Sequence, residues 1–196
     1  MTGAKEGARQ RMSKADRRAQ LLSVAREMIR SDGADALTLG TLADRAGITK
    51  PVVYEHFGDR SGLLAALYRQ FDERQRASLE TALASAGPDA EGVVAVVAAS
   101  YLDCARAEGA EMGGVVAALN GTPVLARMRQ ESVAAYVERC RAALTEVVGA
   151  DRVEPIALEA AVASADALAG AVLASRIDES AALQTLRRFL LAAVTG

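Results

Sequence analysis

The chain has 196 residues, of which 51% are hydrophobic, 24% charged and 4% aromatic, with no Trp. This length suffices for one medium domain or for a small domain joined to a larger one, and the composition is typical of a folded protein. Strand-forming residues and turn signals are too sparse for an all-β sandwich, so we expect an all-α fold. Two cysteines, Cys104 and Cys140, are too few for a disulfide scaffold.

The N-terminal residues are polar and basic with no apolar core, so we expect no signal peptide. Apolar stretches such as 93–99 are far shorter than the ~20 residues of a membrane span. These features predict a cytoplasmic protein with no membrane partner. In that compartment both cysteines are expected to pack as small apolar residues, with a redox sensor at Cys104 as the weaker alternative.

Charge is distributed unevenly along the chain. The whole sequence has a net charge of −2, which combines +4 over residues 1–76 with −6 over residues 77–196. A basic first part followed by an acidic remainder suggests a polyanionic partner for the first part alone. A solvated basic tail explains the same charges equally well.

The first predicted helix follows a polar stretch, residues 1–12, which we expect to be a flexible arm. Ser13 and Asp16 have the spacing of a capping pair at the start of an amphipathic helix over 14–30. Gly33 is suited to end this helix because its backbone can adopt a left-handed conformation.

The rest of the chain also shows helical periodicity. Three helices are predicted after N-cap residues: 39–46 after Thr38, 50–56 after Thr49 and 60–85 after Asp59. Five more are predicted at about 89–108, 110–119, 123–148, 154–176 and 179–194. Glu108 and Glu111, beside the break at Gly109, are expected to be solvated.

The most informative stretch is 38–57, TLGTLADRAGITKPVVYEHF, in which two short helices are separated by Gly47, Ile48 and Thr49. Gly47 can supply a left-handed turn, and the small Ala43 allows the two helices to cross closely. This is the layout of a helix-turn-helix, whose second helix enters the DNA major groove. Many helical hairpins share a glycine turn, so the stretch alone does not decide the function.

Its context is more specific. Over residues 14–68, the Thr38 cap, the run from Tyr54 to Phe57 and the start of a long helix at Asp59 closely resemble the TetR family of transcriptional regulators. Beyond this region only the size and the helical pattern match. The resemblance implies a helix-turn-helix domain over 1–59 and a helical effector-binding and dimerisation domain over 60–196. It also implies a repressor that binds a palindromic double-stranded DNA operator as a homodimer and leaves it when a small molecule binds.

The resemblance further implies which residues contact DNA. Lys50 and Val52 are expected at base edges, Pro51 and Tyr54 at thymine methyls or sugars, and Thr38, Tyr54, His56 and Arg60 at the backbone. The helix N-terminus at Thr49 can direct amide donors to phosphate, and Arg17 and Arg18 can add positive charge. Gly40 stands where a polar residue is common in the family, which puts a base contact from that helix in doubt.

Helices between residues 89 and 148 are expected to line the effector pocket. The candidates are Tyr101, Cys104, Met112, Val116, Asn120, Met128 and Tyr136. Because aromatics are few and Val, Ala, Leu and Met are frequent, we expect an aliphatic cavity and an apolar effector. Each candidate is also consistent with plain core packing.

The last two predicted helices are expected to form the homodimer interface. Its candidates are Ala161, Ala165, Leu168, Val172, Leu186 and Phe189. An internal core can use the same residues, so this interpretation depends on the resemblance.

We expect neither an enzyme nor a cofactor. His56 is the only histidine and has no cysteine partners at metal-ligand spacing, so no metal site is predicted. Nucleophile elbows and glycine-rich phosphate loops are also absent from the sequence. The alternative function is a helical small-molecule-binding or protein-interaction module without specific DNA binding.

Overall fold

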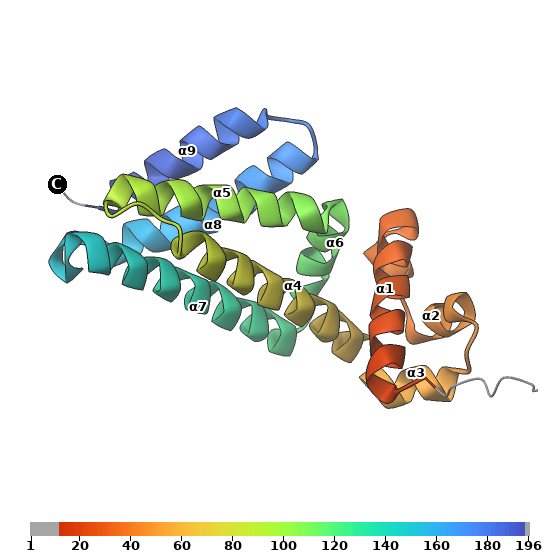
Figure 1. Ribbon diagram of the computed structural model, residues 1–196. Helices are drawn as coiled ribbons and strands as arrows, with labels where there is room; N and C mark the ends of the chain where they lie inside the picture. Colours follow the sequence, from red (N-terminus) through yellow and green to blue (C-terminus); the bar gives the residue numbers. More distant parts are fainter. Residues whose placement is uncertain (1–11, 195–196) are drawn as a thin grey trace, which may run out of the picture.

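The computed structural model describes residues 12–194, which form nine α-helices and two short 3-10 helices. In chain order they are α1 (Lys14–Asp32), η1 (Ala34–Ala36), α2 (Leu39–Ala46), α3 (Lys50–Phe57), α4 (Arg60–Leu83), α5 (Ala90–Glu108), α6 (Ala110–Leu119), α7 (Pro123–Val148), η2 (Ala150–Arg152), α8 (Pro155–Leu173) and α9 (Glu179–Ala192). Helices α1 to α3 form a small lobe, and α4 leads from it into a larger helical lobe (Figure 1). The prediction of an all-α fold is confirmed. The predicted arm, apart from Met12, lies outside the described residues.

Local capping explains where the helices of the small lobe begin. Thr38 and Thr41 form a complete capping box, in which each hydroxyl oxygen accepts from the other residue's backbone N–H at 3.0 Å. At α1 only half of the predicted pair forms, because the Ser13 hydroxyl instead donates to the Asp16 carboxylate at 2.6 Å. Capping therefore defines these helix starts even where the reciprocal bond is missing.

Thr49 precedes α3 at the N-cap position, but its side chain makes no capping hydrogen bond. The reason is local. Pro51 has no N–H, and the Val52 N–H donates to the Thr49 carbonyl at 3.1 Å. Thr49 thus starts α3 through its backbone rather than through its hydroxyl.

The turn between α2 and α3 has the predicted left-handed glycine, since Gly47 has φ 65° and ψ 34°. The Ile48 N–H donates to the Ala43 carbonyl at 3.1 Å, which closes the end of α2. Ala43 and Val53 are fully buried beneath the crossing. The helix-turn-helix geometry predicted from this stretch is therefore present.

The start of α4 requires a glycine at its third position. Asp59 caps the helix by accepting from the Gly62 N–H at 2.8 Å. A Cβ atom at Gly62 would lie 2.0 Å from the Phe57 carbonyl oxygen, which belongs to the end of α3. The close approach of α3 to α4 thus depends on the missing side chain.

Two hydrophobic clusters form the core. The first joins α1, α2 and α3 to the start of α4, to Met112, Val115 and Leu119 of α6, and to Leu125 of α7. The second is built from α5, α7, α8 and α9, with Leu79 of α4. Because the first cluster includes α4 and α6, the core of the small lobe extends beyond residue 59, and the predicted boundary there remains a prediction.

Helix α8 ends three residues earlier than predicted. Ser175 has φ 54°, and the Arg176 N–H donates to the Ala171 carbonyl at 2.9 Å. This is a left-handed helix end without glycine, so no local sequence signal marked it.

By length and composition, α8 is apolar enough to cross a membrane, with a mean hydropathy of 1.7. Core helices of soluble proteins pass the same test, and α8 packs against α5, α7 and α9. About 33% of this apolar segment is buried within the chain, so much of it remains at the surface.

We predict that Gly62→Ala destabilises the protein, because the new Cβ meets a backbone carbonyl that cannot move without shifting α3. The expected loss is ~1–3 kcal/mol of unfolding free energy in a urea titration. Gly113→Ala is the matched control, since nothing lies within 4 Å of a Cβ there and the residue is exposed within α6. It should gain about 0.5–1 kcal/mol. Equal effects of the two changes would contradict the steric argument.

Candidate nucleic-acid interface and effector cavity

The residues of α3 that were predicted to face outward and inward lie on opposite faces of the helix. Lys50, Pro51 and Tyr54 are exposed, and the Tyr54 side chain retains 52% of its accessible surface. Val53 and Phe57 are buried in the first core cluster. Val52 and His56 are half-buried at the edges of this face. The face therefore offers an ammonium, a proline ring and a phenol to solvent.

The Lys50 side chain lies over the first turn of α2. A Cβ at Gly40 would be 3.6 Å from Lys50 Cε and 3.7 Å from its Nζ. It would also be 3.7 Å from the Thr38 hydroxyl oxygen. A long polar side chain at position 40 would compete with Lys50 for this space, so the glycine allows the ammonium to lie beside the start of α2.

Arg60 has a structural role that sequence analysis missed. Its Nε donates to the Leu37 carbonyl and its Nη2 to the Ala34 carbonyl, both at 2.8 Å. These bonds hold the segment before α2 against the start of α4. A phosphate contact by Arg60 remains a prediction. It requires the guanidinium to bind phosphate while it keeps its hydrogen bonds to the two carbonyls.

Arg18 also binds inside the small lobe. Its Nη1 donates to the His56 carbonyl at 2.6 Å, and its guanidinium lies 4.7 Å from the centre of the Phe57 ring. Arg18 thereby satisfies a carbonyl at the end of α3 and fixes α3 against α1. Its predicted contribution to phosphate binding competes with these contacts.

Two titratable groups on α3 respond to their surroundings. Burial lowers the pKa of the His56 imidazole, and the nearby Lys14 charge lowers it further, so the ring is neutral at pH 7. The Lys14 ammonium donates to Glu55 at 2.8 Å, and this bond lowers the pKa of the Glu55 carboxyl. A neutral His56 can contact a phosphate only as an uncharged hydrogen-bond donor.

Glu108 is buried at the contact between the two lobes, which corrects the expectation that it is solvated. It is 4% exposed at the end of α5. Arg74 of α4 donates to both carboxylate oxygens, at 2.5 and 2.7 Å, and Arg26 of α1 approaches one of them at 2.9 Å. The bond to Glu108 raises the pKa of the Arg74 guanidinium above its usual value. The side chain of Glu111, which was also expected to be solvated, is outside the described part of the structure.

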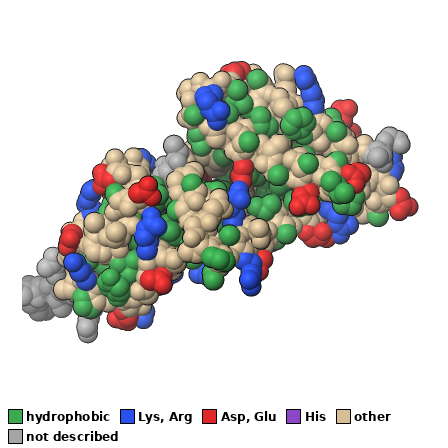
Figure 2. Space-filling model, turned by 180° about the vertical axis from the view of Figure 1, so that it is seen from behind, with side chains coloured by type: hydrophobic (Ala, Val, Ile, Leu, Met, Phe, Trp, Pro, Cys, Tyr) green, Lys and Arg blue, Asp and Glu red, His purple; other side chains and the backbone are tan. Residues whose placement is uncertain are grey.

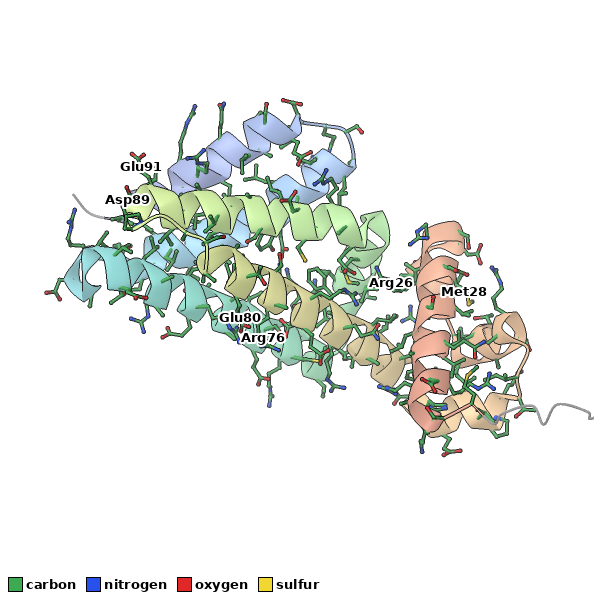
Figure 3. The ribbon with its side chains drawn as sticks, in the orientation of Figure 1. Arg26, Met28, Arg76, Glu80, Asp89 and Glu91 are labelled. Carbon is green, nitrogen blue, oxygen red and sulfur yellow. The ribbon has the colours of Figure 1, made fainter. Side chains whose placement is uncertain are left out.

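These contacts connect three helices through one carboxylate. Figure 3 shows Arg26 leaving α1 on the side that faces the larger lobe, whereas Met28 points into the small lobe. A buried carboxylate requires charged hydrogen-bond donors, because its desolvation is otherwise strongly unfavourable. The Arg26–Glu108–Arg74 cluster therefore holds α1 against α4 and α5.

A cavity of about 320 Å³ lies among α4, α5, α7 and α8. Its polar and aromatic lining residues are Tyr68, Gln75, Tyr101, Arg129, Ser132, Tyr136 and Asp166. The Tyr101 hydroxyl donates to Asp166 at 2.5 Å, and Arg129 forms an ion pair with the same carboxylate. The rings of Tyr101 and Tyr136 meet edge to face with 5.5 Å between centroids.

This lining differs from the aliphatic cavity expected from composition. Composition counts residues over the whole chain, whereas the fold gathers three of the four tyrosines around one space. The four valines and alanines in the lining share it with an ion pair. The expectation of a purely aliphatic lining is therefore wrong for this cavity.

Of the seven predicted effector residues, Tyr101 and Tyr136 line the cavity together. Met112, Val116 and Met128 instead pack into the first core cluster, and Asn120 is exposed at the end of α6. Met112, Val116 and Met128 thus face a core and Asn120 does not, and the sequence could not show which space each face lines. No sequence pattern indicated that Arg129 and Asp166 line the cavity, since isolated charges on helices are usually solvated.

Cys104, the remaining effector candidate, is buried on α5 beside Glu108. Burial raises the pKa of the Cys104 thiol to about 11 and that of Cys140 to about 12. Both thiols therefore stay protonated at neutral pH, which disfavours the alternative of a redox sensor.

The predicted dimer residues divide into two groups. Ala161, Ala165 and Leu186 are at most 2% exposed, so they pack within the protomer and cannot meet a partner. The prediction is wrong for these three, because periodicity marks an apolar face without showing what covers it. Leu168 and Val172 are half-buried against the second cluster, and Phe189 is 46% exposed.

The outer face of α8 is also apolar. Its exposed residues recur at spacings of three and four: Ile156, Ala160, Ala163, Ala167, Gly170 and Ala174. Ile156 is 77% exposed. Figure 2 shows that hydrophobic side chains also gather in patches on one face of the larger lobe. We call the six residues the outer α8 stripe.

A larger groove of about 530 Å³ lies between the ends of α4 and α7. It is lined by Leu83, Pro88 and Val147, with Glu80 and Arg139 beside them. None of the predicted effector residues reaches it. Within residues 12–194, no group of three metal-ligating side chains comes together.

Comparison with known sequences finds similarity mainly in the small lobe. Residues 21–67 match the model of a family described as bacterial regulatory proteins, tetR family. The chain is 43% identical over 63 residues to the HTH-type transcriptional activator FasR of Mycolicibacterium smegmatis, which covers 32% of this chain and 29% of that protein. It is 38% identical over 87 residues to the HTH-type transcriptional regulator BetI of Paraburkholderia phytofirmans, or 43% of this chain and 44% of that one. The chain thus spans less than half the length of the curated relatives it matches.

Comparison with solved structures extends over both lobes. A TetR-like transcriptional regulator from Rhodococcus sp. RHA1 superposes with a TM-score of 0.73 at 20% identity, covering 92% of this chain and 97% of that one. The SmeT–triclosan complex gives a TM-score of 0.69 at 21% identity, covering 91% of each chain. At these identities the likeness shows the fold.

We predict that Glu108→Ala destabilises the protein by about 3 kcal/mol, because it leaves two guanidinium groups at a buried contact without their anion. Thermal and urea unfolding measure this loss. Asp103→Ala is the control on the same helix, since its pair with Arg106 is more than half exposed, and it should cost less than ~1 kcal/mol. Similar losses for both variants would show that Glu108 does not connect the lobes.

Proposed function

Because residues 21–67 match the model of the tetR family of bacterial regulatory proteins, we propose that this chain is a ligand-responsive repressor of that family. In this proposal a homodimer binds a palindromic operator in the cytoplasm and leaves it when a small molecule occupies the cavity. The observation that carries the proposal is the exposed face of α3, where Lys50, Pro51 and Tyr54 point away from a buried helix-turn-helix core. FasR is called an activator, so the direction of regulation is tested below.

The proposed DNA contacts combine charge with shape. Lys50 lies beside the starts of α2 and α3, where backbone N–H groups favour phosphate or base oxygens. Bidentate readers such as Arg, Asn and Gln are absent from α3, so specificity depends on Lys50, on methyl contacts and on DNA shape. The contact set remains Thr38, Thr49, Lys50, Pro51, Val52, Tyr54, His56 and Arg60.

In the proposed release mechanism, α4 and α5 transmit the effect of the ligand, because both helices line the cavity and both take part in the contact between the lobes. Tyr68 and Gln75 of α4 and Tyr101 of α5 line the cavity. The same two helices hold Arg74 and Glu108, and the Glu108 carboxylate binds both Arg74 and Arg26 of α1. A ligand that moves α4 relative to α5 therefore changes how α1 and the DNA-binding helices are held. Such a ligand shifts the DNA affinity only by its preference for one arrangement over the other.

The proposed homodimer uses the outer α8 stripe together with Phe189 of α9. Its small side chains allow a second helix to approach closely, and its apolar surface would be covered in the dimer. A dimer presents two copies of α3, as a palindromic operator requires, with half-sites about one helical turn or ~34–36 Å apart.

Salt-dependent binding to the DNA upstream of the chain's own gene tests the function. We expect specific binding that weakens steeply as salt rises, because lysine and arginine contacts release counterions. Transcription from that DNA should fall when the protein is added, and a rise would indicate an activator. Equal binding to unrelated DNA would instead support the alternative of a helical module without specific DNA recognition.

We predict that Lys50→Ala relaxes the preference at one base pair in each half-site, because the ammonium can donate to guanine O6 and N7. The expected loss of discrimination is roughly 1–3 kcal/mol, measured by binding-site selection. Arg76→Ala is the control, since it removes one positive charge from α4, where Arg76 pairs with Glu80 (Figure 3). A sequence preference unchanged by Lys50→Ala would leave Lys50 as a phosphate contact only.

We also predict that Ile156→Glu converts the dimer to a monomer and abolishes operator binding, because it introduces charge into the outer α8 stripe. Sedimentation velocity measures the oligomeric state. Val124→Glu is closely matched, since both residues directly follow the first proline of a helix and both are 77% exposed. It should leave the dimer intact. A dimer that persists in Ile156→Glu would place the interface elsewhere.

A further inference from the structure

We propose that the cavity among α4, α5, α7 and α8 binds a small, uncharged aromatic molecule that carries a hydroxyl group. This inference rests on the proposed function, because it names the chemical class of the effector. It depends on the size of the cavity, on its aromatic walls and on the pairing of its charges.

The size limits the ligand. A volume of about 320 Å³ lies at the lower end of the range for small-molecule sites, so the cavity suits a molecule with one or two rings.

The walls favour an aromatic body. Tyr68 is 4% exposed, Tyr101 8% and Tyr136 5%, so three largely buried phenol rings form the inner wall, while Ala163, Asp166 and Ala167 lie at the exposed side of the space. Aromatic rings pack favourably edge to face or offset against such walls, as Tyr101 and Tyr136 already do with each other.

The charges of the lining favour an uncharged ligand. Arg129 and Asp166 are the two charged residues that line the cavity, and they form an ion pair. A ligand with a charge of either sign would have to divide this pair or add an unpaired charge to a partly desolvated space. Burial also raises the pKa of the Tyr68 hydroxyl to about 12, so that group remains an uncharged donor.

The hydrogen-bonding groups then favour a hydroxyl. Asp166 accepts from the Tyr101 hydroxyl through one oxygen and from Arg129 through the other. Each carboxylate oxygen has a further lone pair, so a ligand group beside this pair can donate to Asp166. The neighbouring guanidinium offers N–H groups that require an acceptor. A hydroxyl is the small uncharged group that satisfies both needs with one atom, whereas a carbonyl only accepts.

An organic cation is the main competitor, because aromatic walls and a carboxylate also suit a cation. Arg129 already neutralises Asp166, and a ligand cation would lie close to the guanidinium. The same ion pair opposes an organic anion, which would have to displace Asp166 from Arg129. The test therefore compares molecules of one shape that differ in charge and in the hydroxyl.

The experiment is calorimetric titration of the full chain with four probes: 4-methylphenol, toluene, 4-methylbenzoate and 4-methylbenzylammonium. We expect 4-methylphenol to bind at least tenfold more tightly than the other three, because hydrogen bonds to charged groups are stronger than neutral ones. Equal affinity for toluene, tighter binding of either charged probe, or no binding of 4-methylphenol would overturn the proposal.

Variants locate the binding. Asp166→Asn should weaken 4-methylphenol at least fivefold and leave toluene unchanged, while Asp103→Asn makes the same charge change on the outside of α5 and should alter neither. Val133→Phe fills the cavity from a half-buried position and should exclude 4-methylphenol even if Asp166→Asn fails to fold. Unchanged 4-methylphenol binding in Val133→Phe would place the ligand elsewhere and overturn the proposal.

A parallel measurement of operator binding separates the two hypotheses. If 4-methylphenol binds in the cavity and leaves operator affinity unchanged, the ligand class stands and release by that ligand fails. If a charged probe or toluene binds there preferentially and releases the operator, the proposed function stands and the ligand class fails.

Discussion

The structure depends on a single buried carboxylate at the contact between its lobes. Glu108 is 4% exposed, and a carboxylate so far removed from water is stable only when charged donors satisfy it. Arg74 supplies two hydrogen bonds from α4, and Arg26 supplies an ion pair from α1. Because these helices converge on one side chain, its pairing positions the lobes together with the apolar cluster that joins α1, α2 and α3 to α4 and α6. The adjacent contact of α6 with α1 and η1 is apolar and very close, since a Cβ at Gly114 would lie 3.2 Å from Ala34 Cβ.

The same helices connect the cavity to the small lobe. Tyr68 and Arg74 lie less than two turns apart on α4, and Tyr101 and Glu108 lie two turns apart on α5. The walls of the cavity and the lobe contact are therefore parts of the same two rigid elements. In the proposed release, a change of spacing between α4 and α5 at the tyrosines also changes their spacing at the arginine–carboxylate cluster, because helices bend little over such a length. This arrangement gives the proposed release a physical route through packed elements.

The charges of the small lobe have two different roles. Arg18 and Arg60 bind backbone carbonyls of α3 and of the segment before α2, and Lys14 pairs with Glu55. Arg18 and Lys14 thus contact α3 and Arg60 holds the segment before α2, whereas Lys50 remains exposed on the face that we propose meets DNA. The surplus of positive charge in the first part of the sequence is thus partly internal, and a count of charges overstates the number available to phosphates.

The features that could be predicted correctly from the sequence are local. The Thr38 cap, the left-handed Gly47 and the Asp59 cap each depend on residues within four positions, so the helix-turn-helix could be predicted from the sequence. Helix periodicity likewise showed which faces are apolar. What covers each face depends on how the helices pack together. The fold buries Ala161, Ala165 and Leu186 inside the protomer, pairs Glu108 with two distant arginines and gathers three tyrosines around one cavity. Burial and ion pairing depend on elements far apart in the chain, and spacing within one helix contains no information about the helix packed against it.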